Sequence, residues 1–128
     1  MFYRPFVPSL CLALVILGLY SIPGTEIGSL SFWDLLAADK IAHTGIFTVF
    51  TLSLIAAFRR QTRYSGLRAR YKTVAIGLSM TYGAALELLQ AQVFVDRSGD
   101  VLDFIANGLG AFLGLILFRI IYGYELSK

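Results

Sequence analysis

The sequence predicts an all-α membrane protein built as a bundle of four transmembrane helices, and two observations carry this prediction. The first is composition: of 128 residues, 57% are hydrophobic and only 15% are charged, and the mean hydropathy is +0.72. A soluble domain is about a quarter charged, because polar residues have to cover its core. The second is that the apolar residues form four long runs. The length allows one integral membrane domain, residues 1–128.

The four runs cover residues 6–22, 41–58, 73–95 and 101–122. Crossing a hydrocarbon layer about 30 Å thick takes roughly 20 helical residues, so the first two runs are near the short limit. Each run is predicted to be helical, because a lone strand leaves its backbone groups unsatisfied in lipid. The first run lacks a small-x-small cleavage site, and we expect it to be retained. Residues 31–36, in the first connection, have an amphipathic pattern that predicts a short interfacial helix.

Basic residues gather in the second connection. This segment, residues 59–72, holds six of the eleven lysines and arginines, which are Arg59, Arg60, Arg63, Arg68, Arg70 and Lys72. Because such segments stay on the cytoplasmic side, we expect both termini in the cytoplasm. The segment is interpreted as a topology signal that contacts lipid phosphates, and no nucleic-acid partner is expected.

Polar residues recur at helical spacing near the opposite ends of the runs. Asp39, Lys40 and His43 open the second run, with the first and last of them four residues apart. Glu87 and Gln90 are three apart in the third run. The fourth run carries a stripe on one helical face, made of Asp100, Asp103, Asn107, Gly110 and Gly114. A charged side chain inside a span costs about 2.5–3.5 kcal/mol, so these groups are expected to face the interior.

These motifs resemble those of a known family. The order and spacing of Asp39-Lys40-x-x-His43, Glu87-x-x-Gln90 and Arg97-x-x-Asp100-x-x-Asp103-x-x-x-Asn107-x-x-Gly110 are similar to the VanZ-like family. That family takes its name from a protein that contributes to teicoplanin resistance. The resemblance implies a small bacterial multi-pass protein of the cytoplasmic (inner) membrane. It implies no particular reaction.

The candidate catalytic residues are His43, Glu87 and Asp103. His43 is the single histidine, and with Asp39 or Asp103 it is a candidate general acid, general base or metal ligand. Glu87 is a candidate proton carrier or general acid. The alternative for both is structural: a histidine held by hydrogen bonds, and a buried carboxyl that keeps the helices in register. Carboxylates and one imidazole also suit a metal ion, and the sequence leaves open whether a metal or other cofactor binds.

The candidate substrate-binding residues are Lys40, Gln90, Arg97, Asp100 and Asn107. Arg97 can grip a phosphate or carboxylate with two hydrogen bonds, or else it pairs with Asp96 or Asp100. Three residues, Asp39, Gly110 and Gly114, are assigned to structure and packing. The two glycines form a small-xxx-small pattern that lets another backbone approach closely.

The leading hypothesis is a protein that binds or modifies a cell-envelope lipid, with a polar pocket at the extracytoplasmic interface. Its partner is then an outer-leaflet headgroup or a lipid-linked envelope precursor, and glycopeptide sensitivity is a downstream effect. Whether it is an enzyme stays open. One alternative is a non-enzymatic envelope scaffold or resistance protein. Another is a small proton-coupled transporter, which needs oligomers because four short helices enclose little space; the sequence does not determine the oligomeric state.

Overall fold

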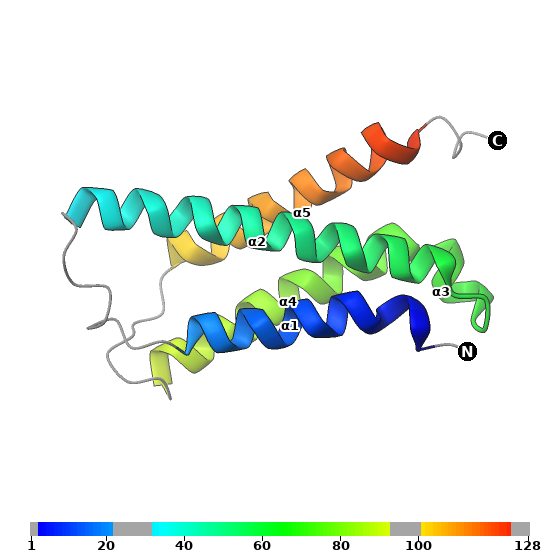
Figure 1. The fold of residues 1–128 in the computed structure, drawn as a ribbon, viewed down its shortest axis with the longest axis horizontal. Helices are drawn as coiled ribbons and strands as arrows, with labels where there is room; N and C mark the ends of the chain where they lie inside the picture. The colour runs from blue at the N-terminus through cyan, green and yellow to red at the C-terminus, as the bar shows by residue number, and fades with distance from the viewer. Residues whose placement is uncertain (1–2, 22–31, 93–100, 124–128) are drawn as a thin grey trace.

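The computed structural model describes residues 3–21, 32–92 and 101–123, and for residues 32–39 it describes the backbone alone. Every regular element in these ranges is a helix: η1 (Arg4–Phe6), α1 (Val7–Tyr20), α2 (Phe32–Arg60), α3 (Ser65–Ala69), α4 (Tyr71–Gln92) and α5 (Val101–Tyr122). Figure 1 shows α1, α2, α4 and α5 side by side, with α3 at one end of the bundle. The start of α1 and the end of α5 lie at that same end.

Within the described residues, three helical stretches are long and apolar enough to cross a membrane. They are Lys40–Arg60, Tyr71–Gln92 and Val101–Tyr122, while Arg4–Tyr20 is apolar but shorter. The prediction of an all-α protein with helices that can span a membrane is thus confirmed. The predicted run 101–122 coincides with α5, and α4 begins two residues before the predicted run 73–95.

The start of α2 differs from the prediction. Residues 31–36 are predicted to form a separate interfacial helix, but the described part of this segment, residues 32–36, forms the first turns of α2. Polar side chains lower the local hydropathy without interrupting a helix, because the helix satisfies its own backbone groups. Helix α2 therefore extends about 12 Å beyond Lys40, at 1.5 Å per residue.

The connection between α2 and α4 is more ordered than its composition suggests, since it contains the short helix α3. The buried Gln61 side chain shapes the turn before α3. Its amide Nε2 donates to the Tyr64 carbonyl oxygen at 2.8 Å, and its Oε1 accepts from the Tyr64 backbone N–H at 3.0 Å. These two bonds fix the path of the chain into α3.

Small residues bring α2 and α5 into close contact. A Cβ atom on Gly110 would lie 2.5 Å from the carbonyl oxygen of Thr44 and 2.8 Å from Cβ of Phe47. A Cβ on Gly114 would lie 2.8 Å from the carbonyl oxygen of Thr48. Only glycine allows this separation, and close backbone approach is a main source of helix association in lipid.

The bundle has polar groups inside and apolar groups outside. The hydroxyls of Ser9 and Ser53 join α1 to α2 at 2.9 Å, and those of Thr51 and Ser79 join α2 to α4 at 2.7 Å. Large apolar side chains are exposed along α1 and α5, among them Leu10, Leu14, Val15, Leu109, Phe112, Ile116 and Ile120. A surface of this kind suits contact with lipid rather than water.

Candidate functional site

Seven polar side chains meet at the end of the bundle opposite α3, and we call them the polar cluster. Helix α1 contributes its last residue, while α4 contributes from its last turns and α5 from its first, so antiparallel packing brings them to one level. The members are Tyr20 from α1, Lys40 and His43 from α2, Glu87 and Gln90 from α4, and Asp103 and Asn107 from α5. All are buried except Lys40, which is partly exposed.

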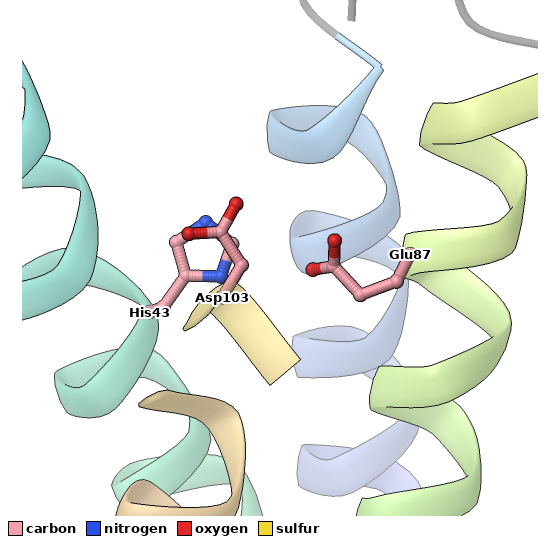
Figure 2. A group of neighbouring side chains, drawn as sticks. All are labelled: His43, Glu87 and Asp103. Carbon is pink, nitrogen blue, oxygen red and sulfur yellow. The ribbon is translucent and has the colours of Figure 1, made fainter. Parts of the chain in front are cut away.

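The centre of the cluster is a group of three titratable side chains. One ligand atom each of His43, Glu87 and Asp103 lies within 4.8 Å of the other two. Figure 2 shows the three side chains directed toward one another from α2, α4 and α5. Their exposed fractions are 2%, 9% and 6%, so these groups interact at short range and largely out of contact with solvent.

The Nδ1 atom of His43 is held by two oxygen atoms. It lies 2.5 Å from the Tyr20 hydroxyl and 3.0 Å from Oδ1 of Asn107, and the Tyr20 hydroxyl donates to the same Oδ1 at 3.1 Å. An amide oxygen only accepts hydrogen bonds, so the contact with Asn107 is a hydrogen bond when Nδ1 carries the ring proton. In the neutral ring the basic lone pair then resides on Nε2.

Two further contacts tie the cluster to the helices around it. The Lys40 ammonium forms an ion pair with Oδ1 of Asp103, joining α2 to α5. Gln90 Nε2 donates to the carbonyl oxygen of Tyr20 at 3.3 Å, joining α4 to the end of α1. The cluster therefore links the four long helices at this end, and its geometry depends on their packing.

The charges of the described members can cancel. The positive charge of Lys40 balances the negative charge of Asp103. The remaining pair, His43 and Glu87, is neutral when the two groups share one titratable proton. A neutral imidazole with a carboxylic acid, and an imidazolium with a carboxylate, both leave the four groups with no net charge. Burial strongly disfavours an unbalanced charge. Chemically, such a pair can take a proton from one atom and deliver it to another without charging the interior.

The same three side chains can also supply metal ligands. An imidazole and two carboxylates match the donors used by zinc and similar divalent cations. The Lys40 ammonium, however, already contacts one Asp103 oxygen, so a cation would compete with it there.

The structure brings together six of the candidate residues, namely His43, Glu87, Asp103, Lys40, Gln90 and Asn107. Gly110 and Gly114 lie one and two turns further along α5, against α2. Arg97 and Asp100 lie outside the described residues. Asp39 belongs to α2, but its side chain is not among those described.

Tyr20 is a member of the cluster that the sequence did not single out. Its position at the end of an apolar run is typical of an aromatic anchor at the membrane surface. Instead it is 3% exposed and its hydroxyl contacts both His43 and Asn107. The sequence did offer one indication, the expected depth of Tyr20 in the membrane. Consecutive spans place the end of the first run and the start of the second on the same side.

Comparison with known proteins adds one finding. A family model described as VanZ/LLP1 matches residues 6–122, a range that includes every member of the polar cluster. No curated protein and no solved structure matches the chain.

Proposed function

Because this chain belongs to the VanZ/LLP1 family of membrane proteins, we propose that it binds and modifies a cell-envelope lipid at the outer surface of the cytoplasmic membrane. The observation that carries the proposal is the convergence of His43, Glu87 and Asp103 within 4.8 Å in the bundle interior. Such a group is costly to bury in a span and is usually retained for function.

The proposed orientation rests on the distribution of charge. The basic connection, residues 59–72, and the last turn of α5, which contains Arg119, lie at the end of the bundle that holds α3. Positively charged segments favour the cytoplasm, so the polar cluster is then on the extracytoplasmic side. The start of α1 and the end of α5 both lie at the basic end, which supports the proposal of four crossings with both termini in the cytoplasm.

The proposed chemistry is acid–base hydrolysis or group transfer on a lipid-linked phosphate or sugar. Nε2 of His43 takes a proton from the attacking hydroxyl group, and Glu87 gives its proton to the departing oxygen. This step converts imidazole and carboxylic acid into imidazolium and carboxylate, so the net charge of the cluster does not change. Asp103 and Lys40 provide a fixed dipole beside the reacting group, and Arg97 is the proposed phosphate clamp.

The test is Glu87→Gln, which keeps the shape of the side chain and removes the acidic proton. In a bacterial host expressing the protein, we expect at least a 100-fold loss of the lipid change that the wild type produces, since acid–base groups contribute about 10²- to 10⁴-fold. Lipids are quantified by mass spectrometry and teicoplanin sensitivity is measured in parallel. Glu125→Gln, after α5, makes the same chemical change as a control.

A Glu87→Gln protein that folds and retains the wild-type lipid profile and sensitivity would overturn the catalytic proposal. It would favour a non-enzymatic envelope protein, for which the hydrogen bonding of residue 87 matters and its proton does not. His43→Gln makes the corresponding change at the base, and the catalytic proposal requires it to fail as well.

A further inference from the structure

A hollow lies at the basic end of the bundle, remote from the polar cluster. It has a volume of about 190 Å³, and its walls come from α2, α3 and α5. The lining residues are Ala56, Arg59, Arg60, Arg68, Phe118 and Tyr122. We call this the arginine hollow, because half of its lining residues are arginines.

The arginines of this hollow are positioned by the fold. The guanidinium of Arg59 lies over the rings of Phe118 and Tyr122, at 5.7 and 5.6 Å from their centroids. Such stacking holds the charge in place while leaving its N–H donors available at the edge. Arg68 belongs to α3, whose start is fixed by the paired hydrogen bonds of Gln61 with Tyr64. The fold therefore positions two of the three arginines that line the hollow, Arg59 and Arg68.

The charge of the hollow is uncompensated within the described part of the chain. The sequence contains no acidic residue between Asp39 and Glu87. Among the described residues, Arg59, Arg60 and Arg68 form no ion pair with a carboxylate. Three positive groups around one small volume repel one another, and an anion placed between them removes that repulsion.

We propose that the arginine hollow binds a phosphate group, carried by an anionic phospholipid headgroup or present as free phosphate. Arginine forks match phosphate oxygens with two parallel hydrogen bonds each. The volume is below the roughly 300–1,000 Å³ of pockets for drug-sized ligands, so it suits a phosphate better than a whole lipid. The hollow also lies at the last turns of α2 and α5, the level at which headgroups meet a spanning helix. This binding is independent of the function proposed for the polar cluster.

The test uses the purified full-length protein in neutral detergent with three probes: short-chain phosphatidylglycerol, short-chain phosphatidylcholine and inorganic phosphate. Arg60→Gln and Arg68→Gln each remove one lining arginine that is exposed, so folding is expected to persist. Each is expected to weaken phosphatidylglycerol binding about tenfold, as for loss of one charge-assisted contact. The matched control is Arg119→Gln, which removes the same charge from the exposed side of α5 and does not line the hollow.

The probes separate the sources of the phosphate. Binding of both phosphatidylglycerol and inorganic phosphate, weakened about tenfold in each of the two hollow variants, supports a site for phosphate itself. Binding of phosphatidylglycerol alone, with the same losses, supports a lipid headgroup site. The proposal is overturned if neither probe binds, if phosphatidylcholine binds as well as phosphatidylglycerol, or if Arg119→Gln weakens binding as much as Arg68→Gln. The last result would mean that only the overall charge of this end attracts the anion.

Discussion

The two ends of the bundle differ in whether their charged side chains are paired with opposite charges. In the polar cluster, Lys40 pairs with Asp103, and His43 and Glu87 lie within reach of each other and of that pair. In the arginine hollow, like charges share one space and aromatic rings hold one of them in position. The difference follows from depth: charges inside the bundle have to be neutralised by the protein, whereas charges at helix ends can be neutralised by headgroups or solvent ions.

The largest effect is expected from separating α2 and α5, which disrupts the polar cluster without changing any member of it. Gly110→Leu places a side chain where even a Cβ would be 2.5 Å from the Thr44 carbonyl oxygen. We expect the free energy of unfolding to fall by more than about 3 kcal/mol, beyond the usual range for overpacking, because backbone atoms cannot move aside. Thermal unfolding in detergent measures the change.

Gly110→Ala keeps this prediction testable if the leucine variant does not fold. Gly45→Ala is the control, since a Cβ on Gly45 of α2 has no atom within 4 Å. If both alanine variants unfold at the wild-type temperature, the close packing of α2 on α5 is not what stabilises this end.

An intermediate effect is expected from breaking the ion pair. Asp103→Ala leaves the Lys40 ammonium without its carboxylate, and we expect a loss of about 2 kcal/mol in the free energy of unfolding. This is less than the roughly 3–5 kcal/mol for a fully buried pair, because 23% of the Lys40 side chain is exposed. The double variant Lys40→Ala/Asp103→Ala restores the charge balance and should regain part of that stability.

The basic end supplies the contrasting measurement. Arg68→Ala removes a charge that has no carboxylate partner among the described residues, so stability in detergent should stay the same or rise. If Arg68→Ala were as destabilising as Asp103→Ala, the distinction between the two ends would be wrong.

The smallest destabilisation is expected at Tyr20. Tyr20→Phe removes the hydroxyl that contacts His43 Nδ1 and Asn107 Oδ1 and keeps the ring packing. We expect a loss of about 0.5–1.5 kcal/mol in the free energy of unfolding, the usual net value of a hydrogen bond. Nitrogen-15 spectra of His43 should show the proton remaining on Nδ1, because Asn107 still accepts it; a switch to Nε2 would refute the tautomer assignment.

The sequence predicted the helices best where apolar residues lie at both ends of the helix. The run 101–122 coincides with α5, because apolar residues flank Asp103 and Asn107 on both sides and continue to the end of the helix. The start of α2 was misjudged because Asp34, Asp39 and Lys40 lower the hydropathy although the helix continues through them. Hydropathy reports where lipid ends, and that need not be where a helix ends.

The candidate site was predictable to the extent that it depends on spacing. Residues three or four apart share a helical face, and antiparallel helices bring Glu87 and Asp103 to a common level. On a helix that is apolar all round, the sequence does not predict which side chains point toward the interior. Helix α1 has no polar face, so its rotation, and with it the inward position of Tyr20, follows only from packing against its neighbours.

The unequal lengths of α1 and α2 make the helical framework stepped at the polar end. Helix α1 ends at Tyr20, which contacts His43, while α2 continues for about 17 Å past that histidine. Helix α1 therefore ends level with the titratable groups, whereas α2 extends well beyond them. The helical framework at the polar end is taller on the α2 side than on the α1 side.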